Sequence, residues 1–92
     1  MLPDSQEKIM KHVKLYTRRW CGWCEAAKEY LKQRGIPFEE VDVGRDSSAD
    51  EEMRRISGQR YVPTIVVDGN VLANFDVTQL ERFLSTLSAS AN

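Results

Sequence analysis

Cys21 and Cys24 are the two cysteines of this chain, and they stand within the segment Trp-Cys-Gly-Trp-Cys at residues 20–24. This segment lies where a strand-like run gives way to a helix-like run from Glu25 to Arg34. A thiol at the first turn of a helix faces unpaired backbone N–H groups and the positive end of the helix dipole, which favour the thiolate. Because Cys24 follows Cys21 by one helical turn, its thiol could attack a mixed disulfide formed at Cys21.

Three kinds of site use such a pair. A structural zinc site needs about four ligands, but this chain offers two cysteines and one distant histidine, His12, so zinc would require a dimer or a partner. A structural disulfide is typical of small secreted domains that are rich in cysteine. The third kind, a thioredoxin-like redox dithiol, is favoured, and Arg18 and Arg19 just upstream add the positive charge that stabilises a thiolate.

Composition limits the class of protein. With 92 residues, of which 41% are hydrophobic, the chain has room for one domain, 1–92, with a modest core. The net charge is −1 and the charges are mixed, which argues against a nucleic-acid partner. No apolar run approaches the roughly 20 residues that span a bilayer, and the N-terminus lacks the apolar segment of a signal peptide. We therefore expect a protein of the cytoplasm without a membrane partner, and we also expect it to act as a monomer.

The elements that must position the cysteines alternate between strand and helix patterns. Runs of β-branched and aromatic residues predict strands at 13–17, 38–43, 64–68 and 71–73. Apolar stripes with capping residues predict helices at 25–34, 48–57 and 77–87, the second capped by Ser48 with Glu51 and the third by Asp76 with Gln79. The order βαβαββα predicts an α/β fold with one four-stranded mixed sheet and helices on both faces.

The two ends of the chain carry weaker signals. Residues 1–12 form a polar N-terminal extension that ends in a surface histidine. Asp4 and Glu7 have the spacing of a capping box, so a short helix from Ser5 to about Lys11 and a frayed extension are equally supported. Residues 88–92 are small and polar and are predicted to form a disordered tail.

This arrangement resembles the glutaredoxin family of the thioredoxin superfamily, including its glutaredoxin-like and mycoredoxin-like dithiol members. The matching stretches are residues 15–24, 35–38 with 41–42, and 58–64. The resemblance implies a thioredoxin-like three-layer fold and a thiol–disulfide oxidoreductase with Cys21 as the nucleophile and Cys24 as the resolving thiol. It also implies a cis bond before Pro63, with the Val62 backbone facing Cys21 and pairing with a bound thiol substrate.

The resemblance assigns further thiol-binding positions. Arg18 falls where many members carry a lysine for the glycyl carboxylate of glutathione; an arginine suits a carboxylate, although a surface arginine that only stabilises the thiolate is almost as well supported. Tyr61 replaces the threonine that usually precedes Val-Pro. Asn74 and Asp76 belong to the segment 73–76, which departs from the family pattern at the γ-glutamyl end of the glutathione site.

Trp20 and Trp23 flank the first thiol and are expected to form an apolar rim for disulfide-bearing proteins. The reductant implied by the resemblance is glutathione, another small thiol or a thioredoxin-reductase-like flavoenzyme, and no metal or permanently bound cofactor is expected. The alternative is an iron–sulfur carrier. In some members of the family, a small residue replaces the motif proline, and two subunits then bridge a [2Fe–2S] cluster. Gly22 fits this pattern, in which Cys21 and glutathione would supply the ligands. A third alternative is a redox-inactive binding module, which would show no thiol–disulfide exchange.

Overall fold

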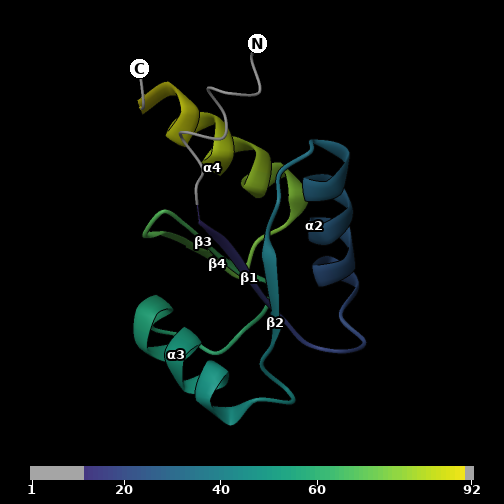
Figure 1. The fold of residues 1–92 in the computed structure, drawn as a ribbon, viewed down its shortest axis with the longest axis vertical. Helices are drawn as coiled ribbons and strands as arrows, with labels where there is room; N and C mark the ends of the chain where they lie inside the picture. Colours follow the sequence, from purple (N-terminus) through teal and green to yellow (C-terminus); the bar gives the residue numbers. More distant parts are fainter. Residues whose placement is uncertain (1–11, 91–92) are drawn as a thin grey trace.

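The computed structural model describes residues 12–90, which form four strands and three helices (Figure 1). In chain order these are β1 (Val13–Thr17), α2 (Gly22–Gln33), β2 (Glu39–Asp42), α3 (Ser47–Ser57), β3 (Thr64–Val67), β4 (Asn70–Ala73) and α4 (Val77–Ser90). The predicted order βαβαββα is confirmed. Apart from His12, the N-terminal extension and its predicted helix lie outside the described residues.

The four strands form one mixed sheet in the order β2-β1-β3-β4. β1 runs parallel to β2 and antiparallel to β3, and β4 returns antiparallel to β3. Leu15 on β1 is level with Glu40 on β2 and with Ile65 on β3. β1 is therefore a central strand, and the loop that follows it carries the cysteine motif.

Each face of the sheet has its own core because successive side chains on a strand point to opposite faces. Leu15 and Ile65 belong to a cluster with buried residues of α2 and α4, whereas their neighbours Tyr16 and Val66 pack with residues of α3. Figure 1 shows the same layers, with α2 and α4 on one side of the sheet and α3 on the other. The predicted three-layer α/β fold is confirmed.

Two helix starts differ from their predicted positions. α2 begins at Gly22 rather than Glu25 because the Cys21 side chain caps it. α3 begins at Ser47, and Asp46 rather than Ser48 is its cap: the Asp46 carboxylate accepts from the backbone N–H groups of Ser48 and Ala49 at 3.0 and 3.2 Å. A carboxylate that binds both N–H groups satisfies more of the free helix end than a hydroxyl at Ser48 could.

The predicted end of α3 at Gly58 is confirmed, with a left-handed φ of 72° that glycine adopts readily. The predicted start of α4 is confirmed too: Asp76 and Gln79 each accept a hydrogen bond from the other's backbone N–H, at 2.8 and 2.9 Å. However, α4 continues to Ser90, so the prediction of a disordered tail is wrong for residues 88–90. Serine and alanine cost a helix little, and no glycine or proline stops it. Among residues 12–90, no helix has the length and apolar character to cross a bilayer.

Candidate redox site

Cys21 and Cys24 form a disulfide at the start of α2. Cys21 is the N-cap residue, and its Sγ accepts a hydrogen bond from the Cys24 backbone N–H at 3.1 Å. The two cysteines differ in access, since Cys21 is half-buried while Cys24 has no exposed surface. A reagent in solution can therefore reach Cys21 but not Cys24.

The three aromatic side chains that were predicted to belong to the site are exposed. Trp20 is 96% exposed and adopts a positive φ of 61°, which is uncommon for a bulky residue. It lines an open, mostly apolar depression with Arg19, Cys21, Gly22 and Glu25. Trp23, in the first turn of α2, and Tyr61, before β3, are each 64% exposed. The predicted rim residues are thus on the surface, and Trp20 lines the same depression as Cys21.

The bond between Val62 and Pro63 is cis, as predicted. The Gln59 side chain holds this loop from both directions: its Oε1 accepts from the Tyr61 N–H at 2.8 Å, and its Nε2 donates to Thr64 Oγ1 at 3.0 Å. Thr64 Oγ1 in turn donates to the Tyr61 carbonyl oxygen at 2.8 Å. Sequence reasoning did not single out Gln59, because an amide side chain in a loop gives no signal of which backbone groups it will bind.

Arg18 joins three parts of the molecule. Its Nη1 donates to the Arg60 carbonyl oxygen and its Nη2 to Asp50 Oδ1 on α3, both at 3.3 Å. Asp50 Oδ2 also lies 4.0 Å from Arg54 Nη1. The guanidinium at the predicted glutathione-carboxylate position is therefore already engaged by a carboxylate of the protein itself.

The segment after β4 lies against the loop with the cis bond. Asn74 has a positive φ of 56°, and its backbone N–H donates to the Pro63 carbonyl oxygen at 2.8 Å. The next residue, Phe75, is buried in the core with α2 and α4, a role that sequence reasoning did not assign. Asp76 caps α4. The structure thus brings Asn74 next to Pro63 and uses the two residues that follow for packing and capping.

Two charged networks brace the sheet near the site. The buried Tyr16 hydroxyl donates to Glu52 Oε1 at 2.7 Å, and Lys14 Nζ binds the same oxygen at 3.0 Å. Burial, with help from Glu52, raises the pKa of Tyr16 to about 12, and the Tyr16 and Lys14 hydrogen bonds hold the pKa of Glu52 below its usual range. These contacts join β1 to α3.

The second network lies one helical turn after Cys24. Lys28 Nζ pairs with Glu25 at 2.9 Å and with Glu40 on β2 at 3.1 Å. The buried Thr17 hydroxyl donates to the same Glu40 oxygen at 2.9 Å. The hydrogen bonds to Glu25 and Glu40 raise the pKa of Lys28. Within residues 12–90, no group of three His, Cys, Asp or Glu side chains is arranged to hold a metal ion.

Comparisons with family models, with curated proteins and with solved structures all match glutaredoxins or glutaredoxin-like proteins. The glutaredoxin family model matches residues 13–72. The glutaredoxin-like 8.6 kDa protein of the Clostridium pasteurianum rubredoxin operon is 39% identical over 78% of this chain and 96% of its own length. Glutaredoxin 3 of Escherichia coli is 33% identical over 73% of this chain and 81% of its own length. Among solved structures, the glutaredoxin-like NrdH-redoxin from Escherichia coli superposes with a TM-score of 0.68 at 30% identity, covering 77% and 92% of the two chains.

Proposed function

This chain belongs to the glutaredoxin family, and on that premise we propose that it is a dithiol oxidoreductase that reduces the disulfides of proteins and mixed disulfides of glutathione-type thiols. The observation that carries the proposal is the asymmetry of the cysteine pair. Cys21 is accessible at the helix start, and Cys24 is completely buried behind it. Such an arrangement separates a nucleophile from a resolving thiol.

The reaction follows from this asymmetry. The Cys21 thiolate attacks one sulfur of the substrate disulfide, and the other sulfur leaves as a thiolate that takes a proton from water. The Cys24 thiol then attacks Cys21 Sγ and releases the second substrate thiolate, which takes up the proton that Cys24 loses. Two electrons pass from the dithiol to the substrate, and the Cys21–Cys24 disulfide seen in the structure is the product. A reductant must return two electrons to begin the next cycle.

The start of α2 supports the first step. The Cys24 backbone N–H points to Cys21 Sγ, and the same N–H would stabilise a negative charge on that sulfur once the disulfide is reduced. The helix dipole acts in the same direction. The network of Glu25, Lys28 and Glu40 holds α2 against β2, so the thiolate would form at a fixed position.

Substrate binding in this proposal uses one backbone segment and three exposed aromatic side chains. We assign the Val62 backbone, beside Pro63, as the strand that pairs with the substrate cysteine. The exposed surfaces of Trp20, Trp23 and Tyr61 give an apolar rim suited to a protein rather than to a small polar thiol. Asn74 would contribute from the neighbouring segment, through its contact with Pro63.

Two observations favour a thioredoxin-reductase-type flavoenzyme over glutathione as the reductant. Arg18 is engaged by Asp50, and Phe75 turns inward where the family places a polar residue for the γ-glutamyl group. In addition, the similar NrdH-redoxin from Escherichia coli is a glutaredoxin-like protein with a thioredoxin-like activity profile. We place the reaction in the cytoplasm, with the protein acting as a monomer.

The test couples NADPH oxidation to the reduction of hydroxyethyl disulfide and of insulin. One set of reactions contains thioredoxin reductase, and the other contains glutathione with glutathione reductase. We expect turnover of both substrates with thioredoxin reductase and a lower rate with glutathione. Absence of turnover in every combination, from protein shown to be reducible by dithiothreitol, would contradict the proposed function. A brown protein after anaerobic purification would support the cluster-bridging alternative instead.

A further inference from the structure

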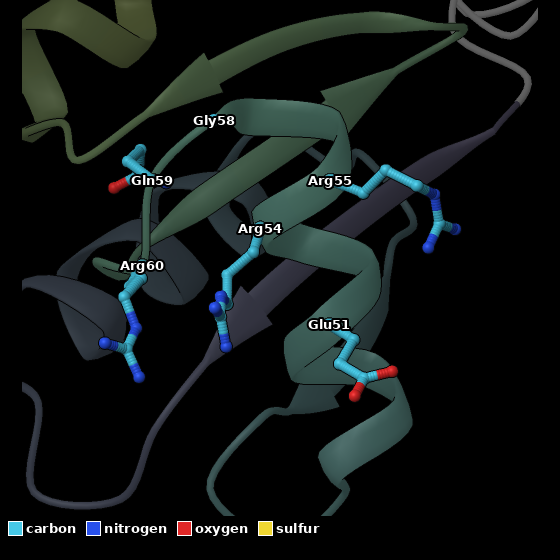
Figure 2. A pocket seen from close by; sticks show the side chains of 6 residues that line it. All are labelled: Glu51, Arg54, Arg55, Gly58, Gln59 and Arg60. Atoms are coloured by element: carbon cyan, nitrogen blue, oxygen red, sulfur yellow. The ribbon is translucent and has the colours of Figure 1, made fainter.

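A groove of about 520 Å³ lies at the C-terminal end of α3, on the side of the loop that precedes β3. Three of the six residues that line it are arginines; the six are Glu51, Arg54, Arg55, Gly58, Gln59 and Arg60. Figure 2 shows the Arg54 and Arg60 side chains extending in the same direction, although one comes from α3 and the other from the loop. Arg55 points away from both. We call the surface between Arg54 and Arg60 the basic groove.

The basic groove has positive charge that the protein does not neutralise. Within residues 12–90, no carboxylate pairs with the guanidinium of Arg60, and Arg54 has only the long 4.0 Å contact with Asp50. Asp50 makes its shorter contact, 3.3 Å, with Arg18. Glu51 is the single acidic residue among those that line the groove. This local excess of cations contrasts with a net charge of −1 for the whole chain.

Helix electrostatics account for only part of this cluster. Arg54 and Arg55 lie in the last turn of α3, where cations stabilise the negative end of the helix dipole. Arg60 lies beyond Gly58, the residue at which the helix ends, so the dipole gives no reason for its charge. Arg54 and Arg60 therefore present two exposed positive charges from two different elements, in a position to bind an anion from outside the chain.

The basic groove adjoins the segment assigned above to substrate binding. Arg60 directly precedes Tyr61 and the cis bond between Val62 and Pro63. Arg18, three residues before Cys21, donates to the Arg60 carbonyl oxygen at 3.3 Å. This hydrogen bond holds Arg60 beside the loop that carries the cysteines. A polypeptide that pairs with Val62 and presents its disulfide to Cys21 would pass close to Arg60.

We propose that the basic groove binds an acidic segment of the disulfide-bearing protein, with aspartate or glutamate residues near the cysteine that Cys21 attacks. The inference rests on the proposed function and names the class of substrate for that same site. Guanidinium groups bind carboxylates through paired hydrogen bonds. Oppositely charged surfaces also accelerate the encounter, an effect that weakens as salt rises.

The test compares two disulfide-bonded peptides that differ only in the residues beside one cysteine, three glutamates in one and three glutamines in the other. For the unmodified protein at low salt, we expect kcat/KM to be about fivefold higher for the glutamate peptide than for the glutamine peptide. The expected factor is modest because exposed ion pairs are individually weak. The preference should shrink in 0.5 M NaCl, where the Debye length falls to roughly 4 Å.

Variants then locate the preference. The double variant Arg54→Gln with Arg60→Gln should reduce both peptides at the same rate, whereas Arg55→Gln, on the same helix but pointing away, should keep the preference. A second double variant, Arg54→Lys with Arg60→Lys, keeps the positive charge and should retain part of the preference for the glutamate peptide. Turnover of hydroxyethyl disulfide should be unchanged in all three, which also shows that each variant is folded.

The outcomes separate the two proposals. Equal rates for the two peptides in the unmodified protein, with normal turnover of hydroxyethyl disulfide, would contradict the basic groove and leave the proposed function standing. A preference that Arg55→Gln removes as fully as the double variant would also contradict it. Failure to reduce any disulfide would instead contradict the proposed function.

Discussion

The sulfur of Cys21 caps the helix that contains Cys24. Its Sγ accepts the hydrogen bond of the Cys24 backbone N–H at 3.1 Å, while the Cys24 side chain has no exposed surface. Cys24 thus has two roles in the proposed mechanism: its backbone N–H stabilises charge on Cys21, and its side chain resolves the mixed disulfide. The spacing of two residues between the cysteines places the N–H of the second within reach of the cap sulfur.

Alkylation should distinguish the two thiols in the reduced protein. We expect iodoacetamide at pH 7 to modify Cys21 well before Cys24, since Cys21 is accessible and stabilised as a thiolate while Cys24 is buried. Peptide mass spectrometry of samples quenched over time measures the order. Similar rates for the two cysteines in the folded protein, with urea-unfolded protein as the control, would argue against the assigned roles.

Replacement of Trp20 by glycine should affect substrate binding and leave the fold intact. The Trp20 side chain is 96% exposed, and its φ of 61° is one that glycine adopts without cost. We expect an undiminished urea midpoint together with a several-fold higher KM for insulin. KM for hydroxyethyl disulfide, which is too small to contact the rim, should stay constant. A loss of stability would show that Trp20 packs in a way that the structure does not indicate.

Removal of the Tyr16 hydroxyl should weaken the link between β1 and α3. Tyr16→Phe leaves Glu52 with Lys14 as its remaining partner, and we expect the free energy of unfolding to fall by about 1 kcal/mol, the typical net value of a hydrogen bond. Tyr30→Phe is the matched control, because no partner of the Tyr30 hydroxyl is found within residues 12–90. Urea denaturation of both variants at pH 7 gives the comparison.

The same hydroxyl should make stability depend on pH in the alkaline range. The pKa of Tyr16 is raised from 10.0 to about 12 in the folded protein, so the folded state holds this proton more tightly than the unfolded state. Its contribution is complete below about pH 10 and is lost as the pH rises to about 12. The difference in stability between the unmodified protein and Tyr16→Phe should therefore decrease across that window. A constant difference would contradict the assignment.

Variants at Asp76 separate capping from ligand binding. Asp76→Ala removes the acceptor of the Gln79 N–H and should lower the free energy of unfolding by about 1 kcal/mol, whereas Asp76→Asn retains an acceptor and should cost little. If Asp76 only caps α4, KM for glutathione should be the same in Asp76→Asn and in the unmodified protein. A several-fold rise in KM for glutathione would instead support the role in glutathione binding that the family pattern assigns to Asp76.

Local patterns were sufficient to predict the fold. The alternation that sends Leu15 and Tyr16 to opposite faces, and the capping pair of Asp76 and Gln79, can be read from adjacent residues. The start of α3 was misplaced because Asp46 and Ser48 are both good caps, and only the backbone conformation decides between them. The cysteine pair, with its position at a helix start, was predicted from its spacing and flanking runs.

Contacts between distant segments could not be predicted. Arg18 and Asp50 are 32 residues apart, and nothing near either residue indicates that they form a pair. Gln59 holds the cis loop by hydrogen bonds whose partners depend on how that loop turns. The basic groove likewise forms only when the end of α3 and the following loop direct Arg54 and Arg60 the same way.

In the proposed mechanism Cys21 attacks the substrate disulfide and Cys24 resolves the mixed disulfide, and trapping of that mixed disulfide distinguishes the two roles. Reduced Cys24→Ser and Cys21→Ser proteins are each mixed with a disulfide-bonded peptide, quenched with acid and weighed by intact mass spectrometry. This mechanism predicts a stable covalent adduct at Cys21 in Cys24→Ser and no adduct in Cys21→Ser, where the remaining thiol is buried. An adduct of equal yield in both proteins, or one that forms only at Cys24, would contradict it.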